Sequence, residues 1–133
     1  MRRTSRIVLG TLALALLGPA GCGSRLNDDR TATVKPGVVH TIIYDPPKKE
    51  QKVTLELSSP GVPVSAYLVL AKDREAAEEA AAANRSPANA LAGQQKVETA
   101  TLEATIPAGA GFVLVLTSTA NKDASVRVKA TGR

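Results

Sequence analysis

Few residues of this chain could act as an acid, a base or a nucleophile, because it contains one histidine and one cysteine. A serine hydrolase would need His40 as its base, with Ser58, Ser59 or Ser65 as the nucleophile. The sequence contains no Gly-x-Ser-x-Gly run, which would expose a serine at a strand-to-helix turn. His40 lies instead in a run rich in β-branched residues. We interpret it as a strand or surface histidine, and no catalytic residue is predicted.

Carboxylates that could form a glycosidase pair are scattered along the chain. The candidates are Asp45, Glu56, Glu98 and Glu103. Glu56 and Glu103 alternate with apolar residues, so they are expected on the solvent side of their strands. Sugar-binding sites usually expose aromatic rings, and this chain has only two tyrosines and one phenylalanine. These carboxylates are therefore interpreted as solvated side chains.

Metal and nucleotide sites find little support in the sequence. One histidine and one cysteine cannot make a histidine pair or a His-Cys cluster for zinc. The glycine-containing loop at residues 109–111 lacks the downstream helix and lysine of a phosphate-binding loop. Two acidic groups could attract a cation, but both are interpreted as solvated. They are Asp28 with Asp29, and Glu75 with Glu78 and Glu79. The sequence therefore predicts no metal and no cofactor.

Cys22 ends a segment that is typical of an export signal. Residues 1–6 contain three arginines, residues 7–17 are largely apolar, and residues 18–21 are small or helix-breaking. An apolar run of this length can engage the export machinery. It is too short for a stable membrane span, which needs roughly 20 apolar residues. The segment predicts a signal peptide over residues 1–21.

The run Ala20-Gly21-Cys22 resembles the lipobox of bacterial lipoproteins, although Pro19 replaces the usual aliphatic residue. The resemblance implies cleavage before Cys22 and a diacylglycerol group on its sulfur. It also favours the periplasmic face of the outer membrane, because Gly23 is not the aspartate that commonly signals inner-membrane retention. The alternative is ordinary signal cleavage, which would release a secreted, soluble chain. A disulfide within the chain is excluded by the single cysteine.

The basic character of the chain belongs largely to its first residues. The whole sequence has 17 Lys and Arg against 12 Asp and Glu, a net charge of +5. Three arginines and no acidic residue lie in residues 1–21, so the remainder carries a net charge of +2. No basic stripe appears, and three aromatic residues cannot form a stacking platform for single strands. Nucleic acid is therefore not a predicted partner.

Apolar residues beyond the signal segment recur mainly at every second position, as in half-buried strands. We expect a polar tether over residues 22–35 and a single domain over residues 36–133. The domain is predicted to be mainly β, a small antiparallel β-sandwich of six or seven strands separated by proline- and glycine-rich turns. The expected strands cover residues 38–44, 53–57, 64–70, 102–106, 112–116 and 126–130, with residues 31–34 as a seventh.

Residues 73–93 interrupt the strands with a helical insertion. Residues 73–83 have strong helix composition, and Asp73 is suited to the N-cap. Ser86 and Pro87 indicate the start of a second short helix that would end at Gly93. The apolar residues are nearly all alanine, and Leu91 is the one large exception. We expect a loosely held cover or an element that faces a partner.

A second resemblance lies in the C-terminal half. Residues 105–109 lead through a proline-alanine-glycine turn into the strand at 112–117, which is followed by another at 125–129. This pattern resembles the closing strands of bacterial pre-peptidase C-terminal β-sandwich domains. The resemblance implies an accessory, non-catalytic module and identifies no site residues.

Three interpretations of function follow from these features. The first is an envelope-anchored lipoprotein, attached to the membrane through Cys22, whose non-catalytic β-sandwich binds or organises envelope components. The second is a docking subunit of an envelope export or assembly complex that binds its protein partner through residues 73–93. A small envelope hydrolase built around His40 has the least support. The sequence indicates no oligomeric state.

Overall fold

The computed structural model describes residues 25–133, so the predicted signal peptide and Cys22 lie outside the described part of the chain. Within it, strands dominate and a single short helix follows the fourth strand. The elements in chain order are β1 (Asn27–Val34), β2 (His40–Tyr44), β3 (Gln51–Ser58), β4 (Val64–Leu70), the 3₁₀ turn η2 (Ala71–Asp73), α1 (Arg74–Ala82), β5 (Ala92–Val97), β6 (Thr99–Ile106), β7 (Phe112–Thr117) and β8 (Ala124–Gly132).

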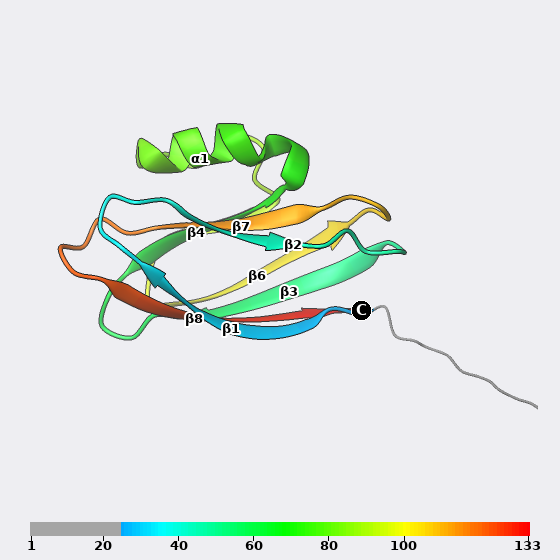
Figure 1. The fold of residues 1–133 in the computed structure, drawn as a ribbon, viewed down its shortest axis with the longest axis horizontal. Coiled ribbons are helices and arrows are strands. Elements are labelled where there is room, and N and C mark those ends of the chain that lie inside the picture. Colours follow the sequence, from blue (N-terminus) through cyan, green and yellow to red (C-terminus); the bar gives the residue numbers. More distant parts are fainter. Residues whose placement is uncertain (1–24) are drawn as a thin grey trace, which may run out of the picture.

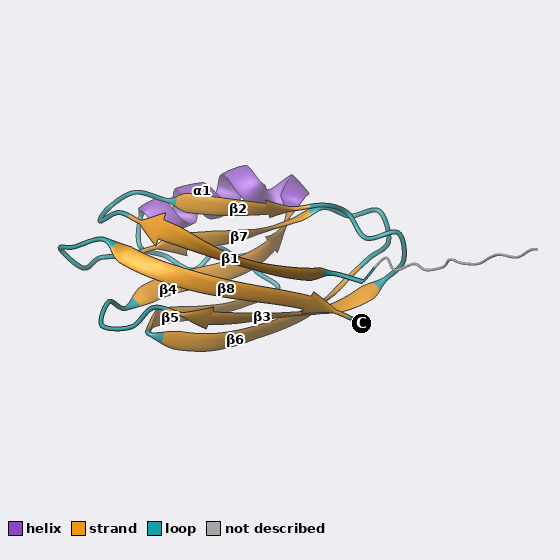
Figure 2. Cartoon of the chain, turned by 60° about the horizontal axis from the view of Figure 1, so that its bottom comes forward, coloured by secondary structure: helices purple, strands orange, loops and turns teal. Residues whose placement is uncertain are grey.

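The strands form two antiparallel sheets of four, ordered β1-β8-β3-β6 and β2-β7-β4-β5. Figures 1 and 2 show the sheets stacked as two layers, with α1 on the outer side of the second sheet. The predicted antiparallel sandwich is confirmed, with one strand more than the largest number expected. No helix in residues 25–133 is long and apolar enough to cross a bilayer.

The core lies between the sheets and follows from the alternation of apolar residues. In β8, Val126, Val128 and Ala130 are fully buried, whereas Arg127 and Lys129 are exposed. β7 is buried at every position because the core covers one face and α1 covers the other. The strand expected at residues 112–116 is thus covered on both faces, as its continuous apolar run implies.

The helix α1 confirms the first half of the predicted insertion. Ala77 and Ala81 are 1% exposed and pack with side chains on the outer faces of β4 and β7, including Tyr67 and Val113. Small side chains let the helix lie close to the sheet. At its start, Asp73 occupies the N-cap position without a side-chain capping hydrogen bond. Its carboxylate instead accepts a hydrogen bond from Asn89, at 3.3 Å.

The predicted second helix is wrong. Asn84 has a φ of 58°, which ends α1, and Pro87 begins a turn closed by the amide of Ala90. The chain then joins the sheet as β5, where Gly93 is paired with Tyr67 rather than ending a helix. A Cβ on Gly93 would come within 2.7 Å of the Tyr67 ring, so glycine permits this close approach. Leu91 is 40% exposed, and a helix here would have had no apolar face to bury.

The expected tether over residues 22–35 is also corrected. Asn27–Val34 forms β1 and pairs with β8 along its whole length. The charged residues at the start of this segment are typical of a polar linker. Pairing with β8, however, supplies the backbone hydrogen bonds that hold residues 27–34 as a strand. The sandwich therefore begins only five residues after Cys22.

Candidate functional site

The residues of a hydrolase do not come together. His40 is opposite Leu116, which is opposite the buried Ala66, so these three positions share the inner face of their sheet. Ser65 is next to Ala66 in β4 and therefore faces the outer side. Ser58 belongs to the other sheet, where it alternates with the buried Leu57.

Ser59 is buried, and its hydroxyl donates a hydrogen bond to the Val62 carbonyl at 2.6 Å. This bond holds the turn between β3 and β4. None of the three candidate serines is thus placed to give a proton to His40.

The candidate glycosidase carboxylates are also dispersed. Glu98 accepts a hydrogen bond from the amide of Gly61 at 2.8 Å, in the β3–β4 turn. Glu103 lies 3.8 Å from the Lys52 ammonium, on the outer face of the first sheet. Glu56 in β3 also lies on the outer face of the first sheet, whereas Asp45 follows β2 at one end of the sandwich. The structure does not pair any two of them.

The acidic groups considered as cation sites have other partners. In residues 25–133, no three His, Cys, Asp or Glu side chains lie close enough to hold a metal ion. Glu78 accepts hydrogen bonds from Thr41 at 2.5 Å and from Arg74 at 3.1 Å. The bond from Thr41, followed by that from Arg74, lowers the pKa of Glu78 against the opposing effect of burial.

A cleft at one end of the sandwich, which we call the Tyr44 cleft, offers the best candidate site. It has a volume of about 350 Å³ and opens between the edge strands β1 and β2, one from each sheet. Two of the three aromatic residues of the chain line it, together with two arginines and two aspartates. The lining residues are Arg25, Leu26, Asn27, Asp28, Arg30, Ile43, Tyr44, Asp45, Pro46, Pro47, Gln51 and Phe112.

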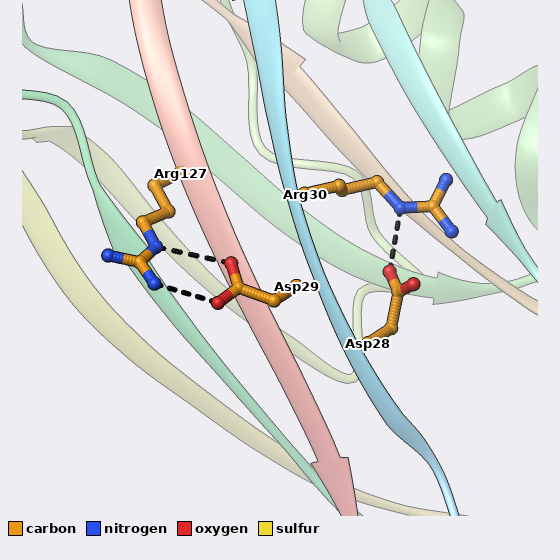
Figure 3. A network of polar contacts seen from close by, with 4 residues as sticks. All are labelled: Asp28, Asp29, Arg30 and Arg127. Carbon is orange, nitrogen blue, oxygen red and sulfur yellow. Dashed lines mark hydrogen bonds and ion pairs between the residues drawn. The ribbon is translucent and has the colours of Figure 1, made fainter.

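The alternation of β1 explains why charged side chains line this cleft. Val34 and Ala32 point into the core, and Arg30 and Asp28 continue the same phase toward the open end of the strand. Figure 3 shows the consequence: the Asp28–Arg30 pair lies on one side of β1, and Asp29 extends to the other side to meet Arg127. The core face of β1 thus changes from apolar to ionic as it leaves the sandwich.

Tyr44 forms the floor of the cleft. Its ring stacks on Phe112 with centroids 5.0 Å apart, and the Arg30 guanidinium lies over it at 5.4 Å from the centroid. The residue is 4% exposed, and its hydroxyl has no hydrogen-bond partner among the described residues. Burial raises the pKa of Tyr44 to about 12, opposed by the charge of Arg30 and reinforced by that of Asp28. The phenol is therefore neutral at physiological pH.

Arg30 keeps most of its hydrogen-bonding capacity. Its Nε donates to Asp28 at 2.6 Å, which raises the pKa of the guanidinium further. Neither Nη atom donates a hydrogen bond within residues 25–133. A guanidinium has five N–H donors in a planar fork, so four remain for a ligand. This arrangement can bind a group with oxygen acceptors, and it contains no histidine or paired acid to move a proton.

The sequence alone does not predict this site. Asp28 falls in the predicted tether, and Asp45 is predicted only as an isolated carboxylate. One signal was present: residues 31–34 alternate threonine with alanine and valine, and extending that period backwards assigns Arg30 and Asp28 to the inner face. The position of Tyr44 in β2 close to Arg30 in β1 could not be predicted from that local pattern, because it depends on how the two sheets stack.

No protein-family model matches the chain, and no curated protein matches it. The resemblance to pre-peptidase C-terminal domains therefore stays a prediction. Among solved structures, the chain is similar to the crystal structure of the Yersinia pseudotuberculosis-derived mitogen, with a TM-score of 0.55 and 11% identity. The alignment covers 80% of this chain and 85% of that one. This likeness concerns the fold of a β-rich domain alone.

Proposed function

We propose that the chain is a lipoprotein of the bacterial envelope whose non-catalytic β-sandwich binds a ligand in the Tyr44 cleft. The observation that carries the binding role is Arg30, which lines the cleft over the ring of Tyr44 and whose Nη atoms donate no hydrogen bond within residues 25–133. A guanidinium with free N–H groups can bind oxygen acceptors of a ligand.

The anchoring role rests on the sequence up to Cys22. The mature chain would start at Cys22 and reach β1 within five residues, so the sandwich would be held at the membrane surface. Gly23 supports placement on the periplasmic face of the outer membrane. The membrane is then the first partner of the domain, and an envelope protein is a further candidate.

Docking through residues 73–93 is less well supported. The alanine face of α1 that could have received a partner is taken by the sheet of the same chain, since Ala77 and Ala81 are buried. Glu75 and Glu79 are exposed on the outside of this helix. Its exposed apolar residues, Ala76 and Ala82, are small and offer a partner little apolar area.

Lipidation can be tested directly by mass spectrometry of the protein isolated from membranes of its native cell. We expect a mature N-terminus at Cys22 with the mass of a diacylglycerol adduct, and recovery in the outer-membrane fraction. The matched control is Cys22→Ser, which should lose the adduct. An unmodified Cys22, or cleavage at another position, would refute the lipoprotein proposal.

A further inference from the structure

We propose that the Tyr44 cleft binds a phospholipid headgroup that carries both a phosphate and a primary ammonium, as in phosphatidylethanolamine. The inference rests on the lipid anchor proposed above, and it names the ligand of the same cleft. The headgroup would belong to the membrane in which the anchor is inserted. Three independent features lead to this class of ligand: chain length, charge balance and the position of apolar residues.

Chain length places the cleft at the membrane surface. Arg25 lines the cleft and is three residues after Cys22, so a fully extended link reaches roughly 10–11 Å. Each headgroup layer of a bilayer is about 5–8 Å thick, the difference between its hydrocarbon and total thickness. A cleft that opens beside so short a link would lie at the level of the headgroups. The C-terminal end of β8 and the loops after β2 and β6 lie at the same end of the sandwich (Figure 1).

The donors in the cleft suit a phosphate. The Arg30 guanidinium lies over the Tyr44 ring and donates only its Nε hydrogen within residues 25–133. Its four remaining N–H groups can donate to two oxygens of one phosphate. Arg25 adds a second positive charge at the rim.

The acidic residues explain why the ligand should also carry a positive charge. Two arginines line the cleft and so do two aspartates, so its formal charge is balanced. Asp28 is paired with Arg30, whereas the Asp45 side chain forms no hydrogen bond or ion pair with the described residues. A simple anion would meet Asp45 unfavourably. A headgroup with an ammonium beside its phosphate would satisfy Arg30 and Asp45 together.

Apolar residues at the rim distinguish a lipid from a small soluble ligand. Ile43 is 55% exposed and borders the cleft together with Pro46, which is also exposed. Lys48 and Lys49 follow in the same loop and are exposed. An apolar rim flanked by lysines is suited to the boundary between acyl chains and phosphates. A free phosphoethanolamine molecule would leave Ile43 in water.

Vesicle sedimentation with the exported Cys22→Ser chain tests the inference without the covalent anchor. Three vesicle compositions are compared: phosphatidylcholine alone, phosphatidylcholine with phosphatidylethanolamine, and phosphatidylcholine with phosphatidylglycerol. We expect the strongest binding to the vesicles that contain phosphatidylethanolamine. Arg30→Gln should weaken it by about tenfold or more, because a charge-assisted hydrogen bond is lost. Circular dichroism and thermal unfolding verify that each variant is folded.

Arg127→Gln is the matched control, since it removes the same charge from an arginine outside the cleft. It should bind the phosphatidylethanolamine vesicles as the parent does. Free phosphoethanolamine, added as a competitor, should displace the protein only at concentrations far above that of the accessible lipid.

Several results would overturn the inference. One is equal binding to all three vesicle types, and another is a preference for phosphatidylglycerol, which would indicate bulk electrostatics. A third is an equal loss in Arg30→Gln and Arg127→Gln. Displacement by free phosphoethanolamine at or below the lipid concentration would identify a soluble ligand instead. Because the test protein carries no lipid, failure here leaves the Cys22 anchor standing, and failure of lipidation is seen only in the mass spectrum.

Discussion

Asp28 and Asp29 are adjacent in the sequence, and each pairs with an arginine, but the two pairs are built differently. Asp29 receives two parallel hydrogen bonds from Arg127, at 3.1 and 2.8 Å, on the outer face of the first sheet. Asp28 receives one hydrogen bond from Arg30, and that arginine lies over a buried aromatic ring. The outer pair uses both carboxylate oxygens. The inner pair uses one carboxylate oxygen and one of the five N–H groups of Arg30.

The difference comes from the two-residue period of a strand, which sends neighbouring side chains to opposite faces. On the outer face, water surrounds an ion pair that is already complete, and such pairs contribute little to stability. On the inner face, the ion pair replaces the apolar core at the open end of the sandwich. Identical chemistry in adjacent positions is thus a contact on the outer face in one case and part of the lining of the Tyr44 cleft in the other.

The largest expected effect tests which side chains of β1 face the core. Val34 is fully buried on the inner face, whereas Thr33 is exposed on the outer face. Val34→Asp should lower the free energy of unfolding by about 3–5 kcal/mol, because it buries an unpaired charge. Thr33→Asp should lower it by about 1 kcal/mol or less. Urea unfolding followed by circular dichroism measures both, and similar losses would contradict the assigned phase.

The fold could be predicted because most of its strands carry their burial pattern in their own residues. Alternation in residues 53–57 and 126–130 and the apolar run at 112–116 each identified a strand. The turns were also predictable from their own residues. Gly61 and Gly109 lie in predicted turns and have φ values of 78° and 76°, which glycine adopts readily. The positions of leucine, valine and glycine were sufficient to predict these strands and turns. Burial decides where the strands lie, and backbone conformation decides where the turns lie.

Residues 31–34 of β1 were predicted as a strand, but the first half of β1, β5 and the cleft could not be predicted because neighbouring strands determine them. β1 starts with charged residues and is held by its pairing with β8, and β5 is exposed at most positions and is held by β4. Tyr44 could be placed in a strand, but its contact with Arg30 depends on two edge strands from different sheets. Local patterns identify strands, and the order of strands in the sheets creates the site.

The second prediction compares the two buried tyrosines. The Tyr44 hydroxyl has no partner in the described chain, whereas the Tyr67 hydroxyl accepts a hydrogen bond from Gln95 at 2.9 Å. Tyr44→Phe should raise the free energy of unfolding by about 1 kcal/mol, since it removes an unsatisfied polar atom. Tyr67→Phe should lower it by about 1 kcal/mol. Thermal and urea unfolding measure both changes.

A loss of stability in Tyr44→Phe would mean that the phenol has a hydrogen-bond partner in solution. Tyr67→Phe, whose parent hydroxyl has such a partner, is the matched control.

The smallest expected effects concern alkaline pH. The folded state holds the pKa of Tyr44 at about 12, against about 10 for an unfolded tyrosine, so the unfolded chain loses this proton first. The contribution of Tyr44 to the free energy of unfolding is therefore fully present below about pH 10, and it is lost progressively as pH rises from 10 toward 12. Urea midpoints measured between pH 9 and 11.5 should fall more steeply in the parent than in Tyr44→Phe. Parallel curves would show that Tyr44 titrates normally.

The same titration distinguishes the two adjacent aspartates most directly. The charge of Asp28 helps to raise the pKa of Tyr44, whereas Asp29 makes no such contribution. Asp28→Asn should shift the tyrosinate absorbance transition of Tyr44 to lower pH, identified by its absence in Tyr44→Phe. Asp29→Asn removes the same charge one residue away and should leave the transition in place. Equal shifts would mean that long-range charge acts on the phenol, and the two faces of β1 would then be electrostatically equivalent.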